Sequence, residues 1–482
     1  MALVALCAIG FARRANEGTR KPEGPTEPPP QETANDKRSP DKTAEPPRAT
    51  EGKDRAELAK ARVAQMLAQK PVHPHLVLSK DDLPGIRERV KAGLPKEAWE
   101  RIRKETEADL GDDLEAVVGQ AKEKKTVLGR FLAELKARKD RAELAQARLA
   151  KKIPPPLNKG CGGEAMTALY QTAFAWLVSG EEQYAGNFRR IAKAMHEAFP
   201  QGIATDDCPI QLALAYDLGY ELLTDEQRQA FRTGFLPAKP DELKKGAEWD
   251  RDFNGAGVYG NLAHPGHFWV LLQLLAVVGE PGFPQDRAEL AQDAAAAAIR
   301  SAQEFLDVFF GADGDYPEHL NYLHYGVQCD LGPLALCALQ RKGINVLGKG
   351  SSYERFLTWV PYELMPGTNV GLGMGDAGLA PTTDPDLYKL LLWANPENPY
   401  ANWLADRIGG GVGIPVGAIL WYRKPQEVDI APLMSPVKHG RYMGTVYFRA
   451  GWGLGEPALT FDVRSFVGIH EQGDIGNFTL HA

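Results

Sequence analysis

Apolar residues recur every three or four positions through most of the chain between about residues 54 and 407. This spacing is typical of helices that bury one face. It predicts helices over 163–178, 182–198, 207–223, 225–235, 262–278, 287–310, 319–340, 353–364 and 385–394. One clear apolar face consists of Leu212, Leu214, Ala215, Leu218 and Leu222. Neighbouring segments pair as helical hairpins without a tight sequence repeat, which predicts a mainly α fold of the α/α toroid type.

Helix starts and stops have their own signals. Ser79, followed by Asp82 three residues later, predicts a capping-box-like start immediately before Leu83-Pro84. Glycine, proline and aspartate separate the helical segments, for example at Ser179-Gly180 and at 311–314. We therefore assign residues 54–430 to one toroid domain.

The pattern changes near the C-terminus. Residues 444–449, 458–464 and 477–481 alternate apolar and polar positions and are rich in β-branched and aromatic residues, so they predict strands. Three strands with exposed edges rarely form a stable sheet alone. We therefore interpret 431–482 as the beginning of an antiparallel β-sandwich domain in a C-terminally truncated chain.

The N-terminal region divides into two parts. Residues 2–12 form an apolar run that is too short for a membrane span and is placed like the core of a secretory signal. The alternative for residues 1–16 is a frayed apolar N-terminus. Residues 17–53 form a linker, because eight prolines and many charges in 17–50 leave little apolar surface to bury. We expect a secreted or periplasmic protein, or one anchored to the surface through this segment.

Composition narrows the function classes. The chain is 44% hydrophobic and 25% charged, and its mean hydropathy is −0.33. These values exclude a multipass membrane protein and a wholly disordered chain. A net charge of −7 argues against a basic nucleic-acid binder. Five cysteines without CxxC spacing indicate neither a zinc finger nor a disulfide scaffold.

Candidate chemistry first appears in a glycine-rich stretch before an apolar helix. The stretch presents Asn254, Asn261, His264 and His267. A helix N-terminus has free N–H groups and partial positive charge, so it suits an anionic ligand. The alternative is helix capping by Asn261 with a packed His264.

A second polar stretch covers residues 313–326 at another loop-to-helix junction. On a helix, Glu318, Tyr322 and Tyr325 share one face, and His319 shares a face with Tyr322. A tyrosine next to an imidazole can transfer protons. The alternative is a buried aromatic face with hydrogen-bonded hydroxyls.

A third stretch, 468–478, places His470 and Asp474 in a turn between two strands. Such a pair can bind a metal or orient an imidazole, but a structural turn explains it equally well. A fourth, residues 371–378, is a tight glycine loop that presents Asp376 and has no phosphate-loop signature.

Taken together, these stretches resemble the heparinase II/III-like polysaccharide lyases, including the related alginate and oligoalginate lyases. The similar segments are 73–83, 212–218, 313–326 and 470–478, and the resemblance covers roughly 73–482. Its most specific part is His470-Glu-Gln472-Gly-Asp474-Ile-Gly-Asn-Phe, which is similar to the family motif H-x-H-x-D-x-G-S/N-F. The resemblance implies an incomplete α/α toroid followed by an antiparallel β-sandwich, with the active site between them.

Position by position, the resemblance implies catalytic roles for Tyr322, His267 and His470, with His264 competing for the role of His267. The candidate substrate-binding residues are Asn261, His264, Asn254, Glu318, Tyr325, Trp269 and Asp376. Trp269, Tyr316 and Tyr325 are candidate stacking surfaces for sugar rings or, alternatively, core residues.

The departures from the family concern metal and completeness. Gln472 stands where the family has a second histidine, a position linked to structural zinc in some members, and glutamine is a poor zinc ligand. We therefore expect that no cofactor is required, with Asp474 as the remaining candidate ligand for a structural zinc. Gly266 replaces an asparagine before the toroid histidine, and a second tyrosine of some members would lie beyond Ala482.

The resemblance implies β-elimination on a uronate-containing glycan. In that chemistry the tyrosine and histidine transfer protons, and Asn and His groups neutralise the uronate carboxylate. The expected partner is an acidic polysaccharide or oligosaccharide, with no nucleic acid and no integral membrane domain. Two alternatives stay open. One is a glycoside hydrolase that uses Asp315 or Glu318 with Asp376, and the other is a catalytically inactive glycan-binding protein.

Overall fold

The structure is a computed structural model, and the residues that it describes belong to one compact unit, Thr50–Ala482. The described residues are 61, 64–65, 71–108, 162–199, 202–203, 209–235, 272–280, 293, 295–296, 299, 303, 306, 310, 313–316, 319–320, 323, 332–372, 385–441, 444–462 and 478–481.

The first described helices follow an extended segment. They are the 3-10 turn η1 (Lys80–Asp82), α3 (Leu83–Arg89) and α4 (Gly93–Ala108). The backbone N–H and the hydroxyl of Ser79 donate to one oxygen of Asp82 at 2.7 and 2.9 Å. The predicted capping-box start is therefore confirmed.

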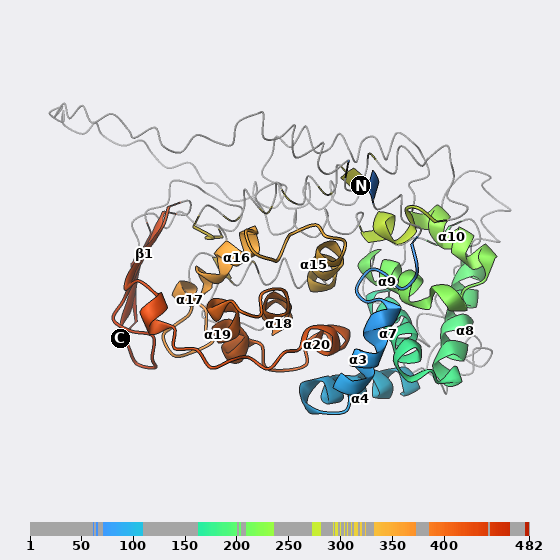
Figure 1. Cartoon of the computed structure of the whole chain (residues 1–482), viewed down its shortest axis with the longest axis horizontal. Helices are drawn as coiled ribbons and strands as arrows, with labels where there is room; N and C mark the ends of the chain where they lie inside the picture. Colours follow the sequence, from blue (N-terminus) through green and yellow to red (C-terminus); the bar gives the residue numbers. More distant parts are fainter. Residues whose placement is uncertain are drawn as a thin grey trace, which may run out of the picture. The chain divides into compact units, whose positions relative to one another are not determined.

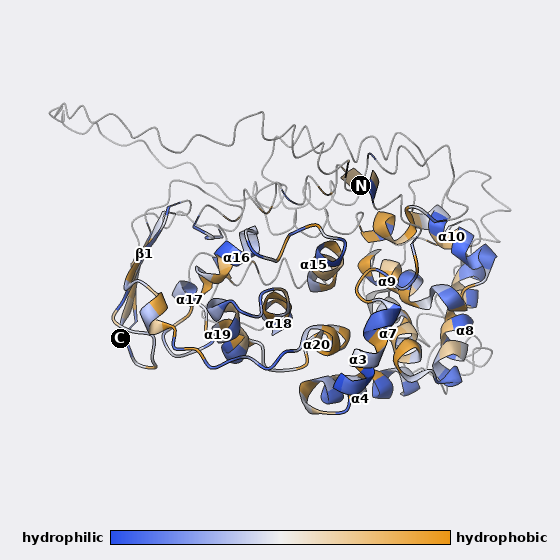
Figure 2. Cartoon of the chain, in the orientation of Figure 1, coloured by the Kyte–Doolittle hydropathy of each residue, from blue (hydrophilic) through white to orange (hydrophobic). Residues whose placement is uncertain are grey.

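The next group packs around a central helix. It consists of α7 (Gly162–Ser179), α8 (Glu182–Ala198), α9 (Pro209–Gly219), η2 (Tyr220–Leu222) and α10 (Asp225–Phe235). Helix α7 packs against α4, α8 and α9. The sequence predicts one apolar face on α9, but residues 210–218 are buried on every side. In Figure 2, hydrophilic residues gather on α4, α8 and α10, whereas α9 is largely hydrophobic.

The third group consists of α15 (Gly332–Arg341), α16 (Ser352–Leu357), α17 (Val360–Glu363), α18 (Pro385–Ala394), α19 (Pro399–Ile408) and α20 (Pro415–Trp421). The predicted helix over 353–364 is wrong in one respect, because the structure divides it into α16 and α17. Pro361 lies in the first turn of α17. Proline has no backbone N–H, so it cannot donate the hydrogen bond that would continue α16 into α17.

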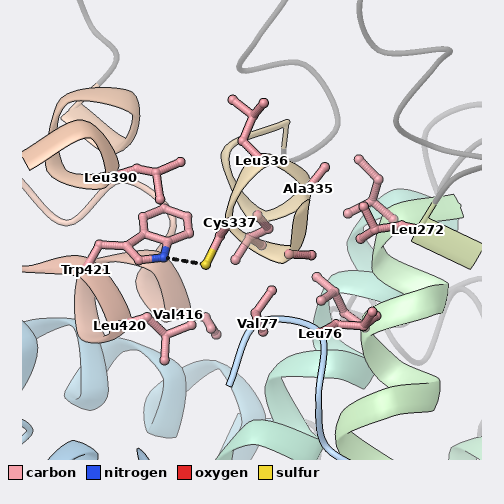
Figure 3. Close-up of a cluster of buried hydrophobic side chains, with 14 of the residues drawn as sticks. Leu76, Val77, Leu272, Ala335, Leu336, Cys337, Leu390, Val416, Leu420 and Trp421 are labelled. Atoms are coloured by element: carbon pink, nitrogen blue, oxygen red, sulfur yellow. Dashed lines mark hydrogen bonds between the residues drawn. The ribbon is translucent and has the colours of Figure 1, made fainter. Parts of the chain in front are cut away.

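Helices from opposite ends of the described chain meet. Helix α20 packs against α3 and α4, and Arg89 of α3 donates to the carbonyl of Leu420 at 2.9 Å. Figure 3 shows Val77 together with Cys337 of α15 and Trp421 of α20 in the same buried cluster. The Trp421 indole donates to the Cys337 sulfur at 3.2 Å. Burial raises the pKa of the Cys337 thiol to about 12, so this cysteine stays protonated and packs as a core residue.

The strands follow the helices (Figure 1). They are β1 (Val437–Gly440), β2 (Thr445–Arg449), β3 (Ala458–Asp462) and β4 (Phe478–His481), and they form an antiparallel sheet in the order β1-β2-β3-β4. Tyr447 lies opposite Thr460, which lies opposite Thr479. The inner face carries the buried residues Thr445, Tyr447, Arg449, Ala458, Thr460 and Asp462.

The outer face of the sheet is apolar. Phe448 pairs with Leu459, which pairs with Leu480, and Phe461 pairs with Phe478. Of these, Phe478 is 69% exposed and Leu480 is 62% exposed. Alternation along the strands thus places several polar residues on the buried face and apolar residues on the outer face, the reverse of an ordinary half-solvated sheet.

A mainly helical chain followed by an antiparallel sheet confirms the predicted fold class, and β1 is a strand that the sequence pattern does not predict. The domain boundaries at 53, 430 and 482 stay predictions. Within the described part of the chain, no helix is both long and apolar enough for a membrane span.

Candidate functional site at the junction of helices and sheet

Most of the residues that the sequence singled out lie outside the described residues. They are Tyr322, His267, His470, Asn261, His264, Asn254, Glu318, Tyr325, Trp269, Asp376, Gln472 and Asp474. Their roles therefore stay predictions. The structure does describe the start of the second polar stretch, residues 313–316 and 319, and it places this start against the sheet.

Asp313 ties the stretch to the end of β1. Its carboxylate accepts hydrogen bonds from the backbone N–H of Arg441 at 3.1 Å and from the Arg441 guanidinium at 3.0 Å on both oxygens. Partial burial alone would raise the pKa of Asp313, but these hydrogen bonds lower it below its ordinary value. Asp313 is therefore ionised at neutral pH and paired in the two-pronged geometry typical of arginine.

Gly314 allows the chain to turn close to α16. Its φ is +80°, and a Cβ atom there would lie 2.3 Å from the backbone carbonyl of Arg355. Only glycine meets both conditions, since other residues are strained in a left-handed backbone and would also overlap Arg355.

We expect Gly314→Ala to destabilise the protein more than Gly350→Ala does. Gly350 also has a positive φ, +83°, but a Cβ atom added there would meet no other atom within 4 Å. Gly350→Ala therefore measures the backbone cost alone, about 1–2 kcal/mol, and Gly314→Ala adds the overlap. Urea unfolding of both variants checks this, and equal costs would contradict the close packing of Gly314 on α16.

Asp315 is buried with no exposed surface and lies under β1. A Cβ atom on Gly440 would approach its carboxylate oxygen to 2.9 Å, which shows how closely the strand covers it. Burial lowers the pKa of nearby Lys438, and the charges of Asp313 and Asp315 oppose this shift. A covered carboxylate cannot protonate a glycosidic oxygen, so the structure disfavours the hydrolase alternative that uses Asp315.

Tyr316 is a core residue. It is 1% exposed, and its ring lies 5.8 Å from that of Phe310. Of the two interpretations of Tyr316, the core residue therefore fits, because almost none of its surface is open to a sugar.

Hydrogen bonds between buried groups connect His319 to the sheet. Its Nδ1 lies 3.1 Å from Glu363 of α17, and the hydroxyl of Tyr447 on β2 donates to the other Glu363 oxygen. The Trp359 indole N–H donates to the Tyr447 hydroxyl at 3.1 Å. The sequence did not predict this chain, because Glu363 and Tyr447 belong to no motif.

A second buried polar cluster joins distant segments of the helical part. His73 directs Nδ1 to Asp217 at 2.6 Å and Nε2 to Glu280 at 2.9 Å. Glu280 also accepts from Tyr216 at 2.6 Å and from Arg232 at 3.0 Å. Asp217 further accepts from the backbone N–H groups of residues 75 and 76. The cluster therefore holds the segment before η1 against α9.

The same cluster contains three residues of metal-ligating type. Ligand atoms of His73, His75 and Asp217 lie within 4.8 Å of one another. Both ring nitrogens of His73 already face carboxylates, and His75 contacts the Lys342 amine. A bound cation would have to displace the His73–Asp217 hydrogen bond and would meet the lysine charge, so the arrangement fits an internal ion pair better than a metal site.

Protonation of His73 couples this cluster to pH. Burial alone would lower the pKa of His73, but Asp217 and Glu280 raise it above its ordinary value. Its charged form therefore stabilises the fold fully below about pH 6.5, and this contribution is lost as the pH rises through the folded-state pKa.

We expect the stability advantage of the wild type over His73→Gln to shrink between pH 6 and 9. Thermal unfolding across that range checks this, and a constant advantage would contradict a charged His73.

A small cavity of about 140 Å³ lies elsewhere, among the ends of α3, α15, α18 and α20. Its lining includes Arg89, Arg341, Cys337 and Trp421. The two arginines bind the carbonyl of Leu420 and the carboxylate of Asp82. Helix C-termini carry partial negative charge, so these cations are explained by the helix ends that they neutralise. We therefore place the candidate site at the sheet junction.

No protein-family model and no curated protein matches the sequence. The fold is similar to several solved structures. Heparinase III has 16% identity and a TM-score of 0.38, with 68% of this chain and 50% of that chain covered. A heparan sulfate lyase HepC mutant from Pedobacter heparinus has 14% identity and a TM-score of 0.43, with 84% and 63% covered. Another heparinase III has 14% identity and a TM-score of 0.42, with 89% and 60% covered.

The chain thus spans between 50% and 63% of the length of these three proteins. At such identities the likeness is one of fold. It is a likeness to heparinases, as the sequence motifs predict.

Proposed function

We propose that this protein is a polysaccharide lyase that cleaves a uronate-containing glycan by β-elimination. The observation that carries the proposal is the position of the stretch that resembles the catalytic segment of heparinase II/III-like lyases. The described start of this stretch is hydrogen-bonded to the end of β1 through Asp313 and Arg441. The stretch thus begins where the helices meet the sheet, which is where the sequence resemblance predicts the active site.

The charges described at this junction balance one another. The Arg441 side chain is 72% exposed but is paired with Asp313, and Lys438 of β1 interacts electrostatically with Asp313 and Asp315. Support for an acidic ligand therefore comes from the sequence resemblance. The net charge of −7 describes the whole chain and does not report on a single groove.

The proposed reaction needs no water. A base removes the C5 proton of the uronate, the C4–O bond breaks, and a C4–C5 double bond remains while the leaving oxygen takes up a proton. The carboxylate must be neutralised first, and donors aimed at developing charge usually supply the largest catalytic contribution. His267 with Asn261 or Asn254 is proposed for that role, Tyr322 for proton transfer, and His470 as a second base or orienting group.

Other expectations belong to the same proposal. The partner is an acidic polysaccharide or oligosaccharide, and the protein works outside the cytoplasm, in the periplasm or in secreted form. No step of the reaction calls for a cofactor. A structural zinc held in part by Asp474 stays a prediction.

The test is incubation of the protein with heparan sulfate, alginate and hyaluronan while ultraviolet absorbance of the conjugated double bond is followed. We expect absorbance to rise with one of these glycans. New reducing ends without a rise in absorbance would indicate hydrolysis, so the protein would be a glycoside hydrolase and not a lyase. Binding without any cleavage would favour the inactive glycan-binding protein.

A further inference from the structure

His319 has a backbone conformation that residues other than glycine rarely adopt. Its φ is +61°, and its side chain is almost fully buried. Such conformations cost of the order of 1–3 kcal/mol and persist only where the surroundings enforce them. Some contact must therefore hold His319 in place.

That contact is Glu363. One of its carboxylate oxygens lies 3.1 Å from Nδ1 of His319, and the other accepts from the hydroxyl of Tyr447. Both carboxylate and imidazole are shielded from water, with 0% and 2% of their side chains exposed. A charge-assisted hydrogen bond in such surroundings is stronger than one at the surface.

Glu363 is itself rigid. Its backbone carbonyl accepts from the N–H of Leu372 at 2.7 Å. On both sides of it, Arg449 of β2 donates to the carbonyls of Pro361, Tyr362 and Leu364. The sheet therefore fixes the side chain of Glu363 through Tyr447 and its backbone through Arg449.

His319 is three residues before Tyr322 in the sequence, less than one helical turn. We propose that Glu363 is a positioning residue that holds His319 in place and through it affects the reaction at Tyr322, which follows in the sequence. This inference rests on the proposed function, because Tyr322 is the proposed proton-transfer group. Displacing a catalytic group by about 1 Å can cost 10²-fold in rate, so a rigid anchor this close in sequence affects turnover.

His319, Glu363 and Tyr447 form an anchor that holds the chain in position. The anchor does not transfer protons to the substrate. Tyr447 is fully buried, and burial together with Glu363 raises its pKa well above the ordinary value. The hydroxyl therefore stays a hydrogen-bond donor to Glu363 throughout the working pH range. The charge of Asp315 acts in the same direction, and the Trp359 indole donates to the same hydroxyl.

The experiment compares Tyr447→Phe with Tyr362→Phe in the full chain. Both variants remove one tyrosine hydroxyl from the same junction, but the Tyr362 hydroxyl donates to the carbonyl of Ser435 at 2.8 Å rather than to Glu363. For Tyr447→Phe we expect kcat to fall about 10- to 100-fold with KM little changed. We also expect faster hydrogen–deuterium exchange in peptides that cover 313–325. Tyr362→Phe should change neither quantity.

Equal losses in both variants would overturn the proposal, because they would show general weakening of the junction. Unchanged kcat and unchanged exchange in Tyr447→Phe would overturn it as well. If the wild type cleaves none of the glycans, the proposed function fails but the exchange comparison still decides. Faster exchange confined to Tyr447→Phe then supports the anchor, and identical exchange in all three proteins rejects it.

Discussion

Replacing Tyr322 by phenylalanine removes the double-bond absorbance with whichever uronate glycan the wild type cleaves. The substitution deletes one hydroxyl and leaves the ring. A positioned proton-transfer group contributes about 10²–10⁴-fold to the rate, so we expect a loss of that size in kcat. The initial rate of absorbance increase at saturating glycan measures it.

The matched control is Tyr400→Phe. Its hydroxyl donates to the carbonyl of Leu433 at 2.9 Å, far along the chain from the stretch that contains Tyr322. We expect near wild-type turnover from this variant. Full activity in Tyr322→Phe would contradict the assignment of the tyrosine and leave the histidines as the candidates for proton transfer.

Replacing Asp217 by alanine destabilises the whole protein. Asp217 is fully buried and accepts hydrogen bonds from His73 and from two backbone N–H groups. Its loss leaves an uncompensated charge and unpaired donors in the core, and breaking a buried pair in this way typically costs about 3–5 kcal/mol. Urea unfolding followed by circular dichroism at pH 6 measures the change in the free energy of unfolding.

Asp225→Ala is the control for this prediction. Asp225 pairs with Arg228 at 2.7 Å, but its side chain is 90% exposed. Exposed ion pairs contribute about 0–1 kcal/mol, so we expect a small effect. If Asp217→Ala cost no more than this control, the buried cluster would contribute little to stability.

Helices were predicted well where apolar periodicity is long. The segments 163–178, 182–198 and 385–394 match α7, α8 and α18 to within one residue. Helix α20 was missed because its seven residues are all buried and mostly apolar, and so short a run has no readable period. Strand β1 was missed because Val437-Lys438-His439-Gly440 is a short edge strand with polar residues and a glycine.

The polar clusters could not be derived from local patterns. His73 meets residues that are 144 and 207 positions away, and no spacing rule encodes such contacts. One signal was present, because Asp217 is a charge inside an otherwise apolar helix and must have a partner there. Glu363 and Tyr447 gave no comparable signal. Both clusters depend on tertiary packing, which sequence periodicity does not specify.

The contact between α20 and the first helices has a consequence for synthesis on the ribosome. Arg89 and Leu420 are separated by 331 residues. At about 5–20 residues per second, the partner of α3 emerges about 15–65 s after α3 itself. Helix α7 emerges much earlier and covers part of both helices, but during that interval the surface that α20 occupies has no native partner. We expect holdase chaperones to bind nascent chains at that surface.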